Sequence, residues 1–418
     1  MKINKDNLKI IFTVCLITFC IQTTDVKIGF VKVSELLLLG FTPFLLVKSI
    51  NKYLFYFLIF FTVETIIGLI LTYTHDFQIL GSSKIKAPYI ITIGRYFELI
   101  SCISLSIITL RLFKSNTTQS KTIINYLVNW NIAITIIFVL LYLLVVARII
   151  PIQHSIFVYD NNRLRGLYNE GGPYGLMLAF IFILTFFQKK DNFRVLKQLF
   201  LFIVIAFCAK SKAGILFTIF WVGILNLDYL KSKLRTFVYP IAIIFIIVFY
   251  YFFINISSMY INEFKVIRKS VQERPEDINL ILGRVSGTYI VPKMIEENPI
   301  FGIGLGNYPL IRNNAEYRTF FPIPPKKIID IDSHGYGGVI DVIVDMGITG
   351  FLWFMFIIYL LYTDLKNINK GKILLLGYLL MLGFGVQLSF LYPWIFIGII
   401  LAYKNRYINE VSGRFTND

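Results

Sequence analysis

Long apolar runs separated by short polar segments form the hydrophobic pattern of the whole chain. A helix of about 20 residues crosses the hydrocarbon core of a membrane, or somewhat fewer when flanking lysines reach the interface. Runs of this kind predict about twelve membrane spans. They fall near residues 7–23, 33–47, 53–74, 89–110, 126–147, 173–188, 196–209, 213–229, 236–255, 336–362, 373–388 and 390–403. The pattern therefore predicts an all-α polytopic integral membrane protein.

One long polar segment, residues 256–335, interrupts this alternation and contains Gly, Pro and both signs of charge. Long loops concentrate function, so we expect a large extracytoplasmic loop with short amphipathic helices. Its stretch "LGRVSGTYIVPKMIEE" predicts a helix that is interrupted at Pro292 and ends before Pro299. The chain then divides into four parts. These are a membrane bundle at 1–255 with spans 1 to 9, the loop at 256–335, spans 10 to 12 at 336–403, and a tail at 404–418.

Composition and charge support a membrane protein and set its expected orientation. Hydrophobic residues make up 56% of the chain and charged residues only 16%, which excludes an ordinary soluble domain. The net charge of +17 is spread over short segments between apolar runs, a distribution that does not favour nucleic-acid binding. With a cytoplasmic N-terminus, the cytoplasmic segments carry about twice as many Lys and Arg as the short outer loops. We therefore expect both termini to be cytoplasmic and the large loop to be periplasmic, with the first apolar run retained as a span.

Basic residues in three outer segments are candidates for binding an anionic substrate. "RLRGLYNEGGPYG" contains Arg163 and Arg165, "AKSKAG" contains Lys210 and Lys212, and Arg284 begins the amphipathic helix of the loop. A guanidinium group donates two charge-assisted hydrogen bonds at once to a phosphate diester or pyrophosphate. The alternative for each residue is contact with lipid headgroups or with solvent.

The stretch "IDIDSHGYGG" near the end of the loop places Asp330, Asp332 and His334 on one face if the chain is extended. Three interpretations remain open. The two aspartates could hold a divalent metal for a nucleotide-sugar transferase, although an outer face has no nucleotide supply. Asp332 could orient His334 as a general base. The histidine could also be an ordinary surface residue.

Two further patterns have mainly structural interpretations. In "ENPIFGIGLGNYPL" the alternating Gly302, Gly304 and Gly306 do not match dinucleotide-binding spacing, and they predict a tight turn that allows close backbone approach. Within the spans, charged residues should face the interior of the bundle, and Arg95 and Glu98 are spaced to form an ion pair.

The order of these motifs resembles the O-antigen ligase/polymerase family of bacterial membrane glycosyltransferases. That family shows an Arg-containing helix, an Asn/His-Pro turn with alternating glycines, and a His before a span that carries an acidic-apolar-Gly-apolar-x-Gly pattern. The chain shows "GRVSGTYIVPKMIEENPIFGIGLGNY" and then "SHGYGGVIDVIVDMGITGFLWF". "RLRGLYNEGGPYG" is similar to the Arg-x-x-Gly segment of the family. "KSKAG" is similar to its Ser-Arg-Gly turn, with Lys212 in place of the arginine.

The resemblance implies an enzyme of the bacterial inner membrane that uses a glycan linked to undecaprenyl pyrophosphate. Arg163, Arg165, Lys210, Lys212 and Arg284 would bind the pyrophosphate. His334, oriented by Asp332, would deprotonate the acceptor sugar hydroxyl, with neither metal nor cofactor. The resemblance favours an O-antigen polymerase, with an O-antigen ligase as the alternative and a multispan transporter or flippase as a second one. Implied partners are the lipid-linked oligosaccharide, the bilayer, a chain-length regulator and a flippase, and no nucleic acid.

Overall fold

The structure is a computed structural model that describes most of the chain. It covers residues 5–28, 31–46, 50–74, 87–116, 119–151, 156–159, 162–189, 192–225, 262, 265–275, 277, 280, 284–323, 335 and 337–411. Within these ranges the chain is mostly helical, with two short antiparallel hairpins between helices.

In the first half of the chain, the described residues form eight α-helices, one π-helical segment and both hairpins. In order they are α1 (Lys5–Gln22), β1 (Lys27–Ile28), β2 (Val31–Lys32), α2 (Val33–Leu46), α3 (Lys52–Thr74), α4 (Pro88–Ser115), α5 (Ser120–Val146), β3 (Val158–Tyr159), β4 (Arg163–Leu164), α6 (Gly171–Phe187), α7 (Arg194–Ile203), the π-helical segment η3 (Val204–Cys208) and α8 (Lys212–Leu225). Tyr159 pairs with Arg163 in the second hairpin.

In the second half, the described residues form part of the predicted long loop at 256–335 and three further long helices. The loop helices are α12 (Arg284–Glu297), α13 (Tyr308–Ile311) and α14 (Ala315–Arg318). The long helices are α16 (Val339–Asp364), α17 (Asn369–Gly383) and α18 (Leu391–Val411).

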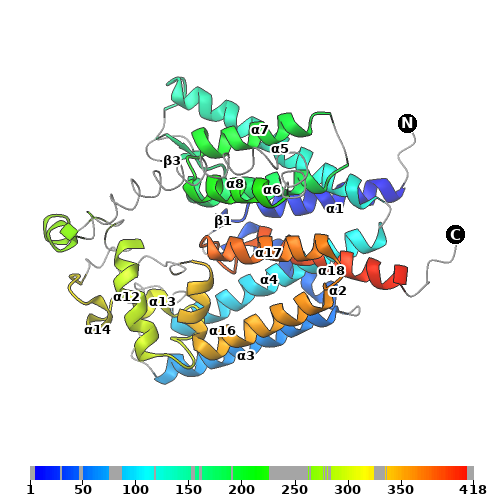
Figure 1. Ribbon diagram of the computed structural model, residues 1–418. Helices are drawn as coiled ribbons and strands as arrows, with labels where there is room; N and C mark the ends of the chain where they lie inside the picture. Colours follow the sequence, from blue (N-terminus) through cyan, green and yellow to red (C-terminus); the bar gives the residue numbers. More distant parts are fainter. Residues whose placement is uncertain are drawn as a thin grey trace, which may run out of the picture.

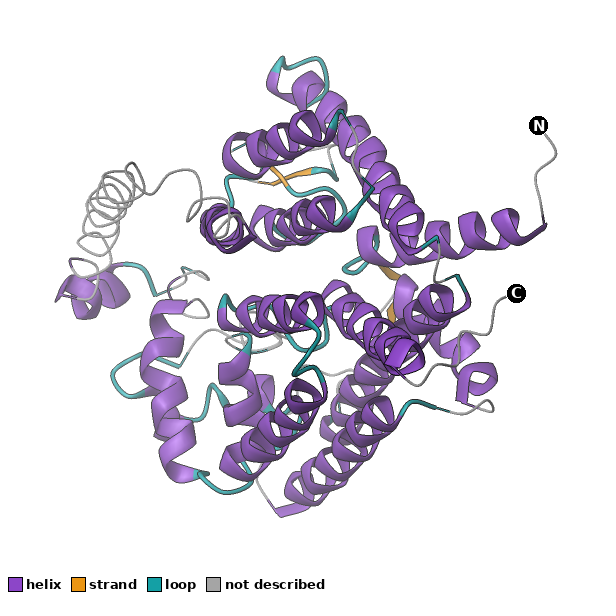
Figure 2. Cartoon of the chain, turned by 45° about the vertical axis from the view of Figure 1, so that its right-hand side comes forward, coloured by secondary structure: helices purple, strands orange, loops and turns teal. Residues whose placement is uncertain are grey.

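The long helices run roughly side by side in two groups, with α17 and α18 between them (Figure 1). Helices α5, α7 and α8 pack around α6, and α5 also packs against α1. In the other group α2 and α3 pack on α4, and α16 packs on α3. The beginning of α1 and the end of α18 lie at one end of the bundle, and α12 to α14 lie at the other (Figures 1 and 2).

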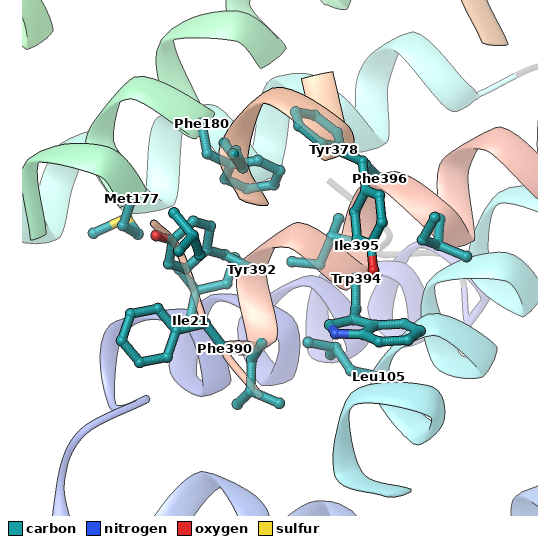
Figure 3. Close-up of a cluster of buried hydrophobic side chains, with 14 of the residues drawn as sticks. Ile21, Leu105, Met177, Phe180, Tyr378, Phe390, Tyr392, Trp394, Ile395 and Phe396 are labelled. Carbon is teal, nitrogen blue, oxygen red and sulfur yellow. The ribbon is translucent and has the colours of Figure 1, made fainter. Parts of the chain in front are cut away.

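Helix α18 lies at the centre of the core and packs most extensively against α4. Its segment from Leu391 to Ala402 is buried on every side, as expected for an apolar helix that other helices surround. Trp394 is fully buried among aromatic side chains of α3 and α17, with ring centroids 5.2 Å from Phe57 and 6.0 Å from Tyr378 (Figure 3). Small residues allow close backbone approach here, since a Cβ on Gly398 would lie 2.6 Å from the Thr109 Cβ.

The helices match the apolar runs closely, with bounds that differ from the predicted spans by a few residues in most cases. Four described helices, α3, α4, α5 and α16, are long and apolar enough to cross a membrane by themselves. Shorter apolar helices occupy other expected spans. The protein is therefore a mostly helical, polytopic membrane protein. The predicted span at 236–255 lies outside the described residues.

The prediction that Pro292 interrupts the loop helix is wrong. Helix α12 continues from Arg284 to Glu297 with Pro292 inside it, and it ends before Pro299 as expected. A proline removes one backbone hydrogen bond, and packing of the neighbouring residues offsets that loss. Ile290, Val291 and Met294 are all buried in the hydrophobic cluster that attaches the loop to the bundle.

Candidate functional site

The candidate site is a pocket of about 500 Å³ formed by residues on five well-separated parts of the chain, most of them in three walls. One wall is the segment that leads into α6, and the second is the turn before α8. The third wall combines Gly337 with the turn between α17 and α18. Three of the five basic residues singled out in the sequence, Arg163, Lys210 and Lys212, line this pocket together.

Arg163 connects two of these walls. It lies in β4, and its guanidinium group donates from Nε to the Ala209 carbonyl at 3.3 Å and from Nη2 to the Lys210 carbonyl at 3.4 Å. These bonds hold the β3–β4 hairpin against the turn at 209–211. The positive charge of Arg163 is therefore fixed in position at the pocket wall.

The turn before α8 presents both lysines to the pocket because its central residue is anchored. Ser211 is buried, donates from Oγ to the Gly172 carbonyl at 2.9 Å, and accepts the Gly214 backbone N–H at 3.2 Å. A Cβ on Gly175 would lie 2.2 Å from the Ser211 Cβ, so only glycine permits this approach. Lys210 and Lys212, on either side of the buried serine, have exposed side chains.

The other two predicted basic residues have different positions. Arg165 is not among the residues that line the pocket, and it donates to the carbonyl groups of Ile156 at 3.0 Å and Asn169 at 3.2 Å. These bonds give Arg165 a role in holding its own loop. Arg284 begins α12, but its side chain lies outside the described residues.

The predicted catalytic residues Asp332 and His334 lie outside the described residues, whereas the glycines that follow them are described. Gly335, Gly337 and Gly338 all have positive φ angles, of 115°, 110° and 69°. A Cβ on Gly337 would lie 2.5 Å from the Gly385 carbonyl oxygen. The chain just after His334 is therefore packed directly against the α17–α18 turn at the edge of the pocket.

The sequence interpretation missed two acidic residues of the pocket, Asp25 and Glu170. Asp25 follows α1, is 8% exposed, and accepts the backbone N–H of Asn169 at 3.2 Å. Burial raises the pKa of the Asp25 carboxyl, although Lys32 and the Asn169 N–H act in the opposite direction. An acid in a short loop after a span gives no sequence signal that would mark it out. With three cations and two carboxylates, the pocket can contact both an anion and sugar hydroxyl groups.

A smaller polar pocket of about 50 Å³ adjoins the first, since Gln387 lines both. Arg95, Glu98, Asp341 and Asp345 also line it. Asp341 accepts the Gly337 backbone N–H at 2.7 Å and so fixes the start of α16 beside the histidine segment.

Two of the residues that line this smaller pocket, Arg95 and Glu98, belong to a buried cluster of ion pairs. The predicted pair is confirmed, with Arg95 Nη1 3.0 Å from Glu98 Oε1. Lys32 Nζ lies 3.2 Å from the same Glu98 oxygen and 2.9 Å from Glu35 Oε1. Two cations and two carboxylates therefore balance one another in a site with little exposure to solvent. The sequence analysis predicted neither lysine pair. Lys32 and Glu98 are far apart in the sequence, whereas Lys32 and Glu35 have the local i,i+3 spacing.

The glycine turn at 299–306 forms backbone hydrogen bonds with α16 at a point where that helix is interrupted. Gly347 has φ 65° and ψ −169°, which interrupts that helix. The carbonyl groups of Val344 and Asp345 accept the N–H groups of Ile303 and Gly304, both at 2.9 Å. In the other direction, the Ile348 N–H donates to the Pro299 carbonyl at 2.9 Å. The prediction of a tight turn that lets backbone approach backbone is thus confirmed.

The outer loop also buries two arginines, Arg312 and Arg318, each 1% exposed. Their guanidinium carbons lie 6.0 Å and 5.8 Å from the ring centroids of Tyr308 and Phe321. Burial, together with the neighbouring Arg312, lowers the pKa of Arg318 to about 10. Within the described residues, no group of three His, Cys, Asp or Glu side chains is placed as metal ligands would be.

The helical fold and the pocket at one end of the bundle define a polytopic membrane protein with a cation-lined pocket. Residues 198–355 match the family model described as O-antigen ligase. This region of the chain is therefore similar to the O-antigen ligase/polymerase family of membrane glycosyltransferases. The matched region contains the lysine turn, α12, the glycine turn and the break in α16. No curated protein matches the chain.

Proposed function

We propose that the protein is a polysaccharide repeat-unit polymerase of the O-antigen type. It transfers a glycan from undecaprenyl pyrophosphate to the non-reducing-end hydroxyl of another lipid-linked repeat. The observation that carries this proposal is the convergence of Arg163, Lys210 and Lys212 on one pocket, whose far wall contains Gly337. The family match supports the glycosyltransferase chemistry.

The basic residues would act on the leaving group. As the bond between the anomeric carbon and the phosphate oxygen breaks, the electron pair moves to the lipid pyrophosphate and negative charge develops there. Arg163, Lys210 and Lys212 stabilise that charge in a pocket formed before the reaction begins. Arg284 is proposed to extend this cationic wall from the loop helix. Arg165 contributes indirectly, because it orders the loop that carries Arg163.

His334 is proposed as the general base. It takes the proton of the acceptor hydroxyl while that oxygen forms the new bond to the anomeric carbon, and Asp332 orients the imidazole. Three residues of chain span at most about 11 Å, so the distance from Gly337 to His334 permits a base at the pocket. The described glycines support this assignment, since they fix the end of the segment at the pocket wall.

Asp25 is proposed to bind a hydroxyl of the acceptor sugar. A carboxylate accepts hydrogen bonds from sugar hydroxyls, and Asp25 lies in the pocket beside the cations that would hold the donor. Its other contact, with the Asn169 N–H, uses only part of its capacity to accept hydrogen bonds. This arrangement would place donor phosphate and acceptor sugar in one pocket.

The expected setting is the bacterial inner membrane, with both termini cytoplasmic and the large loop periplasmic. The beginning of α1 and the end of α18 lie at the same end of the bundle, opposite to α12, which supports this orientation (Figure 1). A flippase would deliver the lipid-linked repeat, and a chain-length regulator would set the length of the product. Because the donor is already activated, the proposed step needs neither a nucleotide nor a metal ion.

The deciding experiment combines deletion of the gene with reconstitution of the full chain. A deletion strain of a polymerase carries core with a single repeat on its lipopolysaccharide gel. Loss of a ligase instead leaves bare core and long glycan stranded on the carrier lipid. In proteoliposomes, the purified chain should convert lipid-linked repeats into longer lipid-linked glycans. Movement of intact repeats across the bilayer without elongation would identify a flippase and refute the proposal.

A further inference from the structure

A second basic pocket lies at the opposite end of the bundle from the candidate active site. It has a volume of about 550 Å³ and is formed by the end of α4, the α2–α3 connection and α18. Arg95, in the small pocket that adjoins the candidate site, and Lys114, in the second basic pocket, lie on the same helix, nineteen positions apart. At 1.5 Å per residue this separation is about 28 Å, close to the thickness of a bilayer core.

The wall contributed by α4 changes from apolar to cationic along the helix axis. Ile107, Leu110, Arg111 and Lys114 follow one another at spacings of three, one and three residues, so they form one stripe on the helix. The first two are buried, Arg111 is half-buried and Lys114 is exposed. This gradient matches a molecule with an apolar chain and an anionic head at the membrane surface.

The positive charge in this pocket is not neutralised within the described part of the chain. None of the described residues that line it is acidic, and no described carboxylate forms an ion pair with Arg111 or Lys114. The nearby Asp364 is already paired with Lys52 and Lys404. Arg111 donates one hydrogen bond to the Leu45 carbonyl, which leaves further N–H donors on its guanidinium group.

We propose that this pocket binds an anionic phospholipid, with its phosphate on Arg111 and Lys114 and its acyl chain along Ile107 and Leu110. The amides of Asn51 and Asn405 at the rim supply neutral hydrogen-bonding groups for the rest of the headgroup. Basic pockets at the cytoplasmic ends of membrane helices recognise anionic lipid headgroups in this way. On the predicted orientation, the lipid belongs to the cytoplasmic leaflet. This inference is independent of the proposed polymerase activity.

Native mass spectrometry of the purified full chain with phosphatidylglycerol or phosphatidylcholine tests the proposal. We expect phosphatidylglycerol to remain bound and the combined Arg111→Gln and Lys114→Gln changes to weaken it about 25-fold, or about five-fold for each cation. The matched control is Lys366→Gln with Lys370→Gln. Both lysines are exposed and lie outside the pocket, the first between α16 and α17 and the second in the first turn of α17.

A second variant distinguishes weaker lipid binding from a loss of folding. Arg111 holds the Leu45 carbonyl, so its substitution can perturb the α2 end, whereas Lys114→Glu leaves that bond intact. We expect Lys114→Glu alone to lower phosphatidylglycerol binding by more than five-fold. Equal retention of the two lipids, equal binding by the pocket variants and the control, or displacement by millimolar inorganic phosphate would each overturn the assignment. The last of these results would identify a free-phosphate site.

Discussion

Gly302 in the outer loop and Gly347 in α16 approach so closely that a Cβ on Gly302 would lie 2.5 Å from the Gly347 backbone nitrogen. Both have positive φ angles, of 68° and 65°. This contact joins the loop that contains α12 to the helix that begins beside the histidine segment. The glycine turn therefore fixes the loop relative to α16.

Substitution of Gly302 or Gly347 by alanine should destabilise the protein by about 3 kcal/mol or more, since it adds steric overlap to a strained backbone conformation. Thermal unfolding of the purified protein measures the change. Gly94→Ala is the control, because a Cβ there has no atom within 4 Å and the residue lies in the helix α4. We expect Gly94→Ala to be neutral or stabilising by up to about 1 kcal/mol. Equal melting temperatures for Gly302→Ala and Gly94→Ala would contradict the packing described.

The lysine turn provides a test of the proposed pyrophosphate site. Lys210→Ala combined with Lys212→Ala should lower the rate of glycan transfer by about 10- to 100-fold, because charge on the leaving pyrophosphate loses two donors. Lys212→Arg keeps the charge and adds a bidentate fork, so it should retain activity. Exposed Lys370 at the other end of the bundle supplies the control, as Lys370→Ala. Full activity of the double variant in a reconstituted assay would refute the pyrophosphate role.

Asp25 should make stability depend on pH. Burial raises its pKa in the folded protein above the value of about 4 for an unfolded aspartate. Its stabilising contribution is therefore complete below that pH and is lost as the pH rises through the folded-state pKa. Above the folded-state pKa, the ionised carboxylate is unfavourable relative to a neutral acceptor. We expect Asp25→Asn to raise the melting temperature at pH 7 and to have a smaller effect near pH 4.

The matched control for Asp25 is Glu273→Gln, which removes an exposed carboxylate whose side chain is 61% accessible. We expect that change to leave the pH dependence of melting as it is in the unaltered protein. If Asp25→Asn melts with the same pH profile as well, burial does not govern this carboxyl.

Glu98 holds two cations of the buried cluster, so its loss should be strongly destabilising. Glu98→Gln removes the carboxylate that pairs with both Lys32 and Arg95, and removal of one member of a buried ion pair costs about 3 to 5 kcal/mol. Chemical or thermal unfolding in detergent measures the loss. The exposed Lys269–Glu273 pair is the comparison, because Glu273→Gln should change stability by less than about 1 kcal/mol. Similar effects of the two substitutions would show that the buried cluster is not important for stability.

The sequence by itself determined where the helices lie. Apolar runs near 53–74 and 89–110 became α3 and α4, because a membrane helix must satisfy its backbone internally and expose apolar side chains. The pairing of Arg95 with Glu98 was also predictable, since it depends only on helical spacing. The order of the loop motifs was sufficient to suggest the family.

Only the tertiary structure decided which distant segments meet. Nothing local in the sequence pairs the Gly302 turn with the break at Gly347, or brings Asp25 and Lys210 to the same pocket. Nor does the local sequence show that Arg163 lines the pocket whereas Arg165 donates hydrogen bonds to carbonyl groups of its own loop. Helix formation depends on neighbouring residues and on hydropathy, and both can be read directly from the sequence. A pocket depends on close backbone approach and charge balance between elements far apart in the chain, and these exist only once the helices have packed.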